Sequence, residues 1–374
     1  MIVYCPTSDF RSPAGRRPLR CPYTDDPLEF GDLPRFTLDR IDPGQPGLWR
    51  YRAMLPVVAP GRDLITLGEG WTPLIEDTWN GQPIYWKMDS MHPTGSYMDR
   101  GFSVLINWLA GLPDVGRLVE DSSGNAGASM ACYAGRARME ACVYVPTSTP
   151  APTKTQIVLY GADLVEVPGP RANAAQAAFN VTRYDPDVAY ASHAWHPGWL
   201  LGQMTCAWEI WEQLGGQVPD WVIAPTGYGG VLVGVWRGFQ HLQASGLINK
   251  LPRLVAVQAD PYLPIYEAFH NGWDRCRPRP QSAEIAASGI AVSHPVRDAT
   301  LLAALFRSRG TVIAVEEEAV LEAQRRMAAR GIFVEPTSAT IGAALDQLKP
   351  AFAPGETVVA VPIGHGLKNP PPVL

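Results

Sequence analysis

The stretch Leu118-Val119-Glu120-Asp121-Ser122-Ser123-Gly124-Asn125-Ala126 carries the clearest indication of the fold. Its first three residues have the pattern of a short β-strand, and the polar residues 121–125 are typical of a turn. An Ala-rich segment follows as far as Ala137, and alanine is the residue that favours a helix most strongly. The stretch therefore predicts a strand, a turn and a helix in direct succession.

The same alternation continues on both sides of this stretch from about residue 64. Further strands are predicted at 141–146, 163–167, 221–224, 254–257 and 357–361, and further helices at 150–160 and 201–214. Such an alternation is typical of an α/β fold with a parallel sheet. Ligands of open α/β sheets bind beyond the carboxyl ends of the strands. The turn after Glu120 and the glycine loop after Ala224 both lie after a strand, so we expect them to belong to one site.

The glycine loop is Pro225-Thr226-Gly227-Tyr228-Gly229-Gly230, and a helix is expected from Val231. Glycines let backbone N–H groups close around a phosphate, and the N-terminus of a helix favours an anion. A glycine-rich turn that binds nothing has the same composition. The loop alone therefore leaves both interpretations open.

The composition is that of a globular protein without an obvious macromolecular partner. The chain has 374 residues, 46% of them hydrophobic, and a formal charge of −5. This charge gives no reason to expect nucleic acid or an anionic membrane as a partner. No apolar run reaches about 18 residues, and the start of the chain lacks the basic and apolar regions of a secretory signal. We therefore expect a cytoplasmic protein.

The segment Pro93-Thr94-Gly95-Ser96-Tyr97-Met98-Asp99-Arg100-Gly101 resembles the P-T-G-S-F-K-D-R-G segment of threonine synthases. These are fold-type II (tryptophan synthase beta-like) enzymes that depend on pyridoxal phosphate (PLP). Other segments of the chain match motifs of that family in the family's order, one before this segment at residues 68–74 and the others after it at 122–127, 196–205, 225–230, 331–339 and 364–368. The resemblance covers roughly residues 64–370 and implies a two-lobed α/β architecture with parallel sheets flanked by helices. It implies an irregular N-terminal arm at 1–63, a large α/β domain at 64–94 and 191–374, and a small α/β domain at 95–190.

The resemblance also implies roles for individual residues. In the family, Asn125 would contact the 3-oxygen of the PLP ring, and the loop with Ser122 and Ser123 would hold the carboxylate of the substrate. The phosphate of PLP would lie on the glycine loop formed by Gly227, Tyr228, Gly229 and Gly230. The lysine of the P-T-G-S-F-K segment holds PLP as a Schiff base and moves the substrate protons, and Met98 stands at its position.

Four positions carry apolar residues where the family has polar or charged ones. Met98 lacks the amine, and Ile363 stands where a threonine hydrogen-bonds the pyridine nitrogen. Trp199 stands where an arginine grips the substrate phosphate, and Met204 replaces a lysine. Trp71 also occupies a ligand-loop position that is often Asn or Gly. The joint pattern indicates divergence toward a more apolar pocket, with PLP held non-covalently or replaced by another phosphate ligand.

Few side chains could take over from the absent amine, because lysine occurs only at positions 87, 154, 250, 349 and 368. Lys87 lies on the preceding strand and Lys154 opens a helix, but the family uses neither for the imine. His365 and His196 are candidate proton carriers, since imidazole titrates near neutrality. A hydrogen-bonded loop histidine is the alternative for both.

The cysteines predict no metal site. Cys5-Pro6-Thr7-Ser8 and Cys21-Pro22-Tyr23-Thr24 resemble the two knuckles of the zinc ribbon that some threonine synthases carry, with the second cysteine of each knuckle lost. Two thiolates do not complete a tetrahedral zinc site. The six cysteines are otherwise scattered and are expected to be reduced, mostly structural thiols.

Two functions are compatible with these residues. The first is a threonine synthase-like lyase or transferase, distinct from threonine synthase, that acts on an amino-acid-derived substrate by elimination, replacement or cyclisation without a lysine imine. The second is a non-catalytic homologue that binds a ligand or supports a partner enzyme. A scaffold has no need of Gly227, Gly229, Gly230 and Asn125 together, which favours the enzyme. The resemblance further implies a homodimer.

Overall fold

The computed structural model describes residues 2–13, 18–58, 61–122, 124–149, 151–169, 171–277 and 283–369. Its contacts divide the chain into two compact units. The first unit contains Met1–Gly70 and Met98–Gly202, and the second contains Trp71–Tyr97 and Gln203–Leu374. The N-terminal residues therefore group with the residues that follow Met98, and one division falls directly before Met98.

The first unit contains two sheets. A small antiparallel sheet has the order β2-β1-β3 and consists of β1 (Ile2–Tyr4), β2 (Arg11–Pro13) and β3 (Glu29–Gly31). Two 3-10 helices follow it, η2 (Leu38–Arg40) and η3 (Gly47–Met54). The second sheet is parallel, has the order β8-β7-β6-β9, and is built from β6 (Arg117–Asp121), β7 (Glu140–Pro146), β8 (Asp163–Val167) and β9 (Val188–Tyr190).

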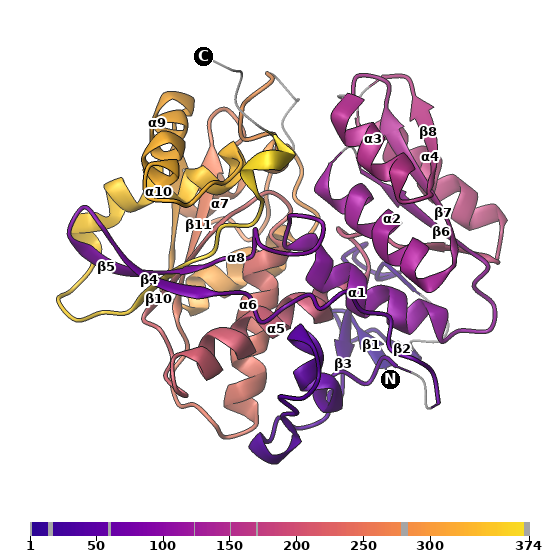
Figure 1. The fold of residues 1–374 in the computed structure, drawn as a ribbon, viewed down its shortest axis with the longest axis horizontal. Helices are drawn as coiled ribbons and strands as arrows, with labels where there is room; N and C mark the ends of the chain where they lie inside the picture. Colours follow the sequence, from indigo (N-terminus) through magenta and orange to yellow (C-terminus); the bar gives the residue numbers. More distant parts are fainter. Residues whose placement is uncertain are drawn as a thin grey trace. The chain divides into compact units, whose positions relative to one another are not determined.

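Three helices connect the strands of this parallel sheet: α2 (Asn125–Ala137), α3 (Ala151–Leu159) and α4 (Arg171–Tyr184), of which the sequence analysis predicted the first two. Helix α1 (Met98–Ala110) precedes β6, and α5 (Pro197–Gln213), which the division between the units crosses, follows β9. Helix α4 packs across all four strands, whereas α2 packs on β6 and β7 (Figure 1). Small residues let α2 lie this close: a side chain at Gly127 would place its Cβ 2.7 Å from the Ser122 carbonyl oxygen.

The second unit contains a six-stranded sheet with the order β12-β11-β10-β13-β5-β4. Its strands are β4 (Leu74–Trp79), β5 (Gln82–Lys87), β10 (Trp221–Pro225), β11 (Arg253–Ala259), β12 (Thr311–Val315) and β13 (Val358–Ala360). All neighbouring pairs are parallel except the antiparallel hairpin of β4 and β5. The helices are α6 (Gly230–Ala244), α7 (Pro264–His270), α8 (Asp298–Arg307), α9 (Glu317–Ala328) and α10 (Pro336–Leu348), with 3-10 turns η4 (Ser288–Ile290), η5 (Lys349–Ala351) and η6 (Gly366–Lys368).

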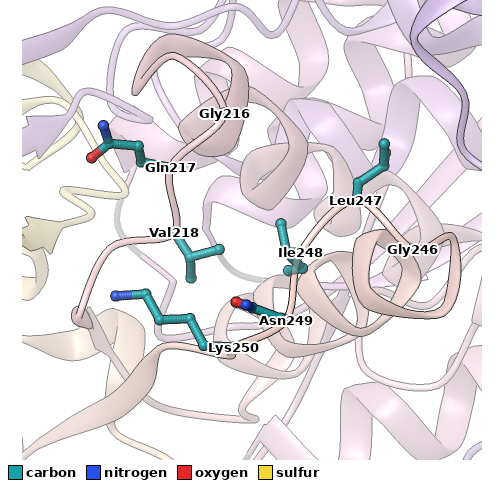
Figure 2. A pocket seen from close by; sticks show the side chains of 8 residues that line it. All are labelled: Gly216, Gln217, Val218, Gly246, Leu247, Ile248, Asn249 and Lys250. Carbon is teal, nitrogen blue, oxygen red and sulfur yellow. The ribbon is translucent and has the colours of Figure 1, made fainter.

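A cavity of about 500 Å³ opens between two loops of this second unit (Figure 2). It is lined by residues 216–218, which follow α5, and by residues 246–250, which follow α6. Both loops lead into the amino ends of strands, since β10 begins at Trp221 and β11 at Arg253. The cavity therefore lies at the opposite end of these strands from the glycine loop.

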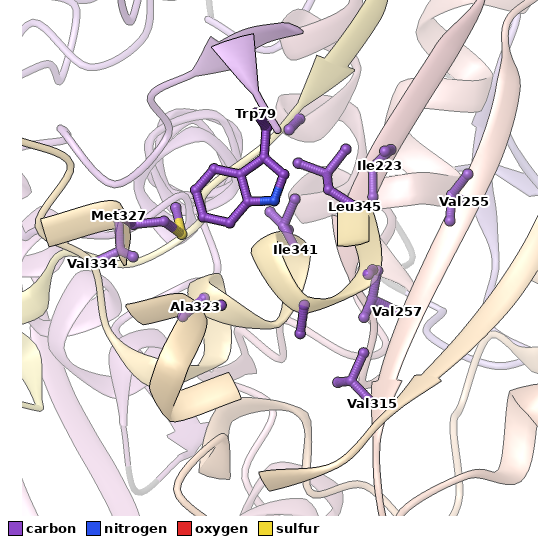
Figure 3. Close-up of a cluster of buried hydrophobic side chains, with 14 of the residues drawn as sticks. Trp79, Ile223, Val255, Val257, Val315, Ala323, Met327, Val334, Ile341 and Leu345 are labelled. Atoms are coloured by element: carbon purple, nitrogen blue, oxygen red, sulfur yellow. The ribbon is translucent and has the colours of Figure 1, made fainter. Parts of the chain in front are cut away.

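The core of the second unit gathers around α10, which packs against β10, β11 and β12 and beside α9 (Figures 1 and 3). Ile341 and Leu345 of α10 meet Trp79 of β4 and the strand residues Ile223 and Val255, and all of them are at least 98% buried. The parallel strands are apolar along their length because helices or loops cover both faces. The predicted α/β class with parallel sheets is confirmed. Among the described residues, no helix is long and apolar enough to cross a membrane.

Candidate functional site

The glycine loop lies where the sequence places it, between the carboxyl end of β10 and the start of α6. Gly229 is the N-cap of α6, has φ +87°, and contributes no side chain that caps the helix. A Cβ at this position would come within 2.9 Å of Leu301 Cδ2, so both the backbone conformation and the space require glycine. A helix start of this form presents backbone N–H groups and the positive end of the helix dipole to an anion.

The C-terminal G-x-G-L-K segment pairs with the residues that precede Met98. Tyr97 N–H donates to the Ile363 carbonyl (2.9 Å), and His365 N–H donates to the Gly95 carbonyl (2.9 Å). The Ile363 side chain is 95% buried, and its backbone N–H donates to Ser338 Oγ at 2.9 Å. The second unit thus fixes the backbone on both sides of Gly95, up to the residue before α1.

His365 is half-buried within this paired segment. Its Nδ1 accepts a hydrogen bond from Leu367 N–H (3.2 Å) and caps the short helix η6. Its ring also meets the edge of Phe333, with ring centroids 5.8 Å apart. His196, the other candidate histidine, is 98% buried in the first unit and accepts from Gly198 N–H (3.0 Å) at the start of α5. One ring nitrogen of each histidine therefore has a structural role.

In the first unit, β6 ends at Asp121 and α2 begins at Asn125, with Ser122 and Gly124 as the described residues between them. Asn125 is the first residue of α2 and is half-buried, while Ser122 is 94% buried and its Oγ accepts from Gly124 N–H at 3.3 Å. Ser123 lies outside the described residues. The helix is not capped by a serine or asparagine side chain, because Gly124 is its N-cap. Met98 is half-buried and begins α1.

Trp199 lies across the first turn of α1. Its indole passes so close to Gly101 that a Cβ there would lie 2.2 Å from the ring. Trp199 is 99% buried, and its ring is edge-on to that of His193 with centroids 6.1 Å apart. Trp71, in the second unit, is by contrast 37% exposed and has a positive φ of 49°.

A carboxylate–imidazole pair that the sequence analysis did not identify lies next to Trp199. His193 Nδ1 is 2.5 Å from Glu120 Oε1, and both side chains are buried. Burial, and then the charge of Asp121, raises the pKa of the Glu120 carboxyl well above its ordinary value, although Arg171 opposes this shift. The only sequence signal was the position of Glu120 near the carboxyl end of a predicted strand. Nothing in the sequence paired it with His193.

Lys87 and Lys154, which the sequence analysis weighed as alternative imine lysines, are both engaged in ion pairs. Lys87 Nζ lies 2.6 Å from Glu209 Oε2 and also donates to the Thr72 carbonyl (2.7 Å) and to Gln213 Oε1 (2.9 Å). Neither charged side chain of that pair is exposed. Lys154 Nζ lies 2.6 Å from Glu166 Oε2 at the surface. The structure therefore explains both lysines without a ligand.

The glutamate of the G-E-G-x-T-P-L motif has a structural role in the first unit. Glu69 is fully buried and accepts hydrogen bonds from Trp49 Nε1 (2.6 Å), Tyr133 OH (2.9 Å) and the Leu67 N–H (2.8 Å). Ser103 of α1 also donates to it. These bonds join the loop before β4 to α1 and α2, so Glu69 holds this part of the unit together.

The chain is similar in sequence to enzymes that depend on pyridoxal phosphate. Residues 65–364 match the family model of pyridoxal-phosphate dependent enzymes. The chain is 35% identical over 335 residues to a threonine synthase of Methanocaldococcus jannaschii, covering 87% of this chain and 81% of that protein. It is 34% identical over 328 residues to a threonine synthase of Synechocystis sp., covering 86% and 82% of the two chains.

Solved structures share the fold. The processed form of a threonine deaminase of Solanum lycopersicum has a TM-score of 0.67 and 20% identity, over 79% of this chain and 79% of that one. A maize serine racemase has a TM-score of 0.67 and 20% identity, over 78% and 88% of the two chains. On the extent of the family match and of the identity to the two synthases, this chain belongs to the fold-type II family of PLP-dependent enzymes and has threonine synthases among its relatives.

Proposed function

We propose that this chain is a lyase or transferase of its family that works without a lysine imine. It acts on an amino-acid-derived substrate by elimination, replacement or cyclisation, and it holds PLP, or another phosphate ligand, non-covalently. The observation that carries the proposal is a glycine loop whose geometry suits a phosphate, in a chain with Met98 at the position where the family resemblance places the lysine. The homodimer implied by the family resemblance belongs to the same proposal, and light scattering of the purified chain tests it.

The glycine loop fits the phosphate of PLP. Gly229 combines a left-handed backbone with a position where no side chain has room, at the N-terminus of a 15-residue helix. Gly227 is similarly confined, since a Cβ there would lie 3.0 Å from Val292 and 3.3 Å from the Gly289 carbonyl oxygen. A side chain at either glycine would collide with neighbouring residues of the second unit, so packing itself requires glycine at both positions. The support for phosphate binding is that this compact loop ends at the N-terminus of α6, where backbone N–H groups and the helix dipole favour an anion.

The side chains that would hold the rest of PLP do not fit a covalent cofactor. Met98 offers a thioether, and Lys87 and Lys154 are bound to Glu209 and Glu166. Ile363 offers no hydrogen-bonding group where the family resemblance places a partner for the pyridine nitrogen. A buried polar atom without a partner costs about 1–3 kcal/mol. We therefore expect PLP to bind more weakly than in relatives that keep both groups.

PLP, when bound, supplies an electron sink for a carbanion at the amino-acid Cα. The chain itself must then hold or move a proton, a task in which general acid–base groups contribute about 10²–10⁴-fold. We assign this task to His365 rather than to Lys87, because the Lys87 ammonium has three hydrogen-bond partners inside the second unit. The backbone of His365 pairs with Gly95, three residues before Met98.

Borohydride reduction tests the proposal on the wild-type chain and on two lysine variants. PLP is added to each protein, the mixture is reduced, and tryptic peptides are weighed for a pyridoxyl-lysine. We expect none from the wild type, and one at position 98 from Met98→Lys. Met91→Lys is the matched control, because Met91 lies two residues before the Pro93–Gly101 segment and is 56% exposed. It should give no specific adduct.

Two other results of this experiment would contradict the proposal. A pyridoxyl group on Lys368 of the wild type would refute the imine-free mechanism and identify the replacement amine, since the Lys368 stem lies against Gly95, where a Cβ would be 3.2 Å from its Cδ. If neither the wild type nor Met98→Lys binds PLP or inorganic phosphate, the non-catalytic alternative is favoured instead.

A further inference from the structure

The N-terminal sheet places two cysteines in matching turns. Cys5 follows β1, and its N–H donates to the Phe10 carbonyl at 3.0 Å. Cys21 begins a second turn before β3, in which its N–H donates to the Asp26 carbonyl at 2.8 Å and its own carbonyl accepts from Asp25 N–H at 2.9 Å. Because β1 and β3 are antiparallel neighbours, the turn after β1 and the turn before β3 lie at the same end of the sheet.

Each thiol contacts a hydroxyl group of the opposite turn. Cys5 Sγ is 3.5 Å from Thr24 Oγ1 of the other turn, and Cys21 Sγ is 3.2 Å from Ser8 Oγ. Each thiol therefore contacts a side chain of the turn that carries the other thiol, although 16 positions separate Cys5 and Cys21 in the sequence. Both are reduced in this structure.

Among the described residues, short turns cover the two sulfurs. Cys5 and Cys21 are each 2% exposed, but Thr7, Pro22, Tyr23 and Thr24 beside them are exposed. By contrast, burial raises the pKa of Cys142, which lies in β7, and raises the pKa of Cys276, which lies in the loop after α7, to about 12. Burial also opposes ionisation of Cys21, but hydrogen bonds from Ser8, Thr24, the Tyr23 backbone and Cys5 outweigh it and lower the pKa of Cys21 to about 7.

We propose that Cys5 and Cys21 form a reversible intramolecular disulfide that joins the two turns of the N-terminal sheet. The oxidant is a low-molecular-weight disulfide such as oxidised glutathione. The Cys21 thiolate attacks one sulfur of that disulfide, forms a mixed disulfide and releases one thiolate. Cys5 then loses its proton and attacks the Cys21 sulfur, which releases the second thiol. Two protein thiols are oxidised and one glutathione disulfide is reduced to two thiols.

A metal site would be the other use of two thiolates. Among the residues that the structure describes, no group of three or more His, Cys, Asp or Glu side chains is placed to hold a metal ion. The sulfurs contact the neutral hydroxyls of Thr7, Ser8 and Thr24, and the buried Asp26 carboxylate accepts a hydrogen bond from Thr7. The observations therefore favour sulfur–sulfur chemistry over coordination.

The test equilibrates the full chain in glutathione buffers from fully reducing to fully oxidising. Free thiols are then alkylated in denaturant, and peptides are mapped without reduction. We expect one linked peptide pair containing Cys5 and Cys21, a mass lower by two hydrogen atoms, and complete reversal by excess reduced glutathione. Cys142 and Cys276 should remain alkylatable at every ratio, which serves as the internal control.

Two variants make the result specific. Cys5→Ser should stop at a glutathione adduct on Cys21, whereas Cys276→Ser should form the same linked pair as the wild type. The inference is overturned if Cys5 and Cys21 both remain free thiols in the most oxidising buffer, or if each accepts glutathione without ever linking to the other. Stoichiometric zinc in the purified chain, measured by mass spectrometry of the metal, would also overturn it. None of these outcomes depends on PLP binding.

Discussion

Replacing Lys87 by methionine should cost far more stability than the same change at Lys154, although both ammonium groups lie 2.6 Å from a carboxylate oxygen. The two pairs differ in burial. Neither Lys87 nor Glu209 has any exposed side-chain surface, whereas the side chains of Lys154 and Glu166 are 19% and 46% exposed. Methionine preserves the length of the lysine stem, so the comparison isolates the loss of the charge.

The expected magnitudes follow from this difference in solvation. Removing one partner of a buried pair leaves the other charge uncompensated and costs about 3–5 kcal/mol. In Lys87→Met, Gln213 Oε1 also loses its donor, while the Thr72 carbonyl still accepts from Gln213 Nε2 at 2.9 Å. Removing a surface partner costs about 0–1 kcal/mol because water solvates the remaining charge.

The assay is guanidinium unfolding of the wild type, Lys87→Met, Lys154→Met and the double variant Lys87→Met/Glu209→Met. The double variant should recover most of the loss, because no isolated charge then remains in the core. The reasoning is refuted if Lys87→Met is no more destabilising than Lys154→Met. It is also refuted if the double variant is less stable than Lys87→Met alone.

Three further predictions concern the loops and the buried pair. Gly229→Ala should weaken the binding of PLP or phosphate and lower the melting temperature. Gly355→Ala is the control and should affect stability alone, because Gly355 has a similar φ of 83° but nothing lies within 4 Å of its Cβ. Fluorescence titration measures the binding, and thermal unfolding measures the stability. Gly101→Ala should cost about 1–3 kcal/mol by displacing the Trp199 indole, and adding Trp199→Ala should relieve the clash, as measured by unfolding and tryptophan fluorescence. Because the pKa of Glu120 is raised in the folded state, the folded chain binds a proton there more strongly than the unfolded chain. The contribution of Glu120 to stability is therefore greatest below the ordinary pKa of 4.5 and declines as the pH rises toward the folded-state pKa. Glu120→Gln should flatten the pH dependence of the melting temperature above pH 4.5.

The sequence predicted the elements that depend on local pattern. The strand and the helix expected within 118–137 are β6 and α2, and the turn expected at 121–125 falls at their junction, where β6 ends at Asp121 and α2 begins at Asn125. The glycine loop was expected between a strand and a helix, and it lies between β10 and α6. These predictions succeeded because strand alternation, glycine conformation and helix starts are determined by neighbouring residues. The parallel α/β class followed from the same alternation.

The sequence could not predict which distant side chains meet. Lys87 looked like a candidate amine, and only the fold shows that Glu209, 122 positions away, neutralises it. Glu120 and His193 are 73 positions apart, and no pattern in the sequence links one to the other.

The amino-acid sequence alone specified the strand, turn and helix at 118–137, the glycine loop, and a methionine at position 98 in a segment that resembles the lysine motif of the family. The tertiary structure determined which charges are buried together and which turns bring the two N-terminal thiols to the same end of a sheet. The physical reason is that periodicity and turn chemistry act over a few residues, whereas the partner of a buried charge or thiol is chosen when segments far apart in the chain pack against each other.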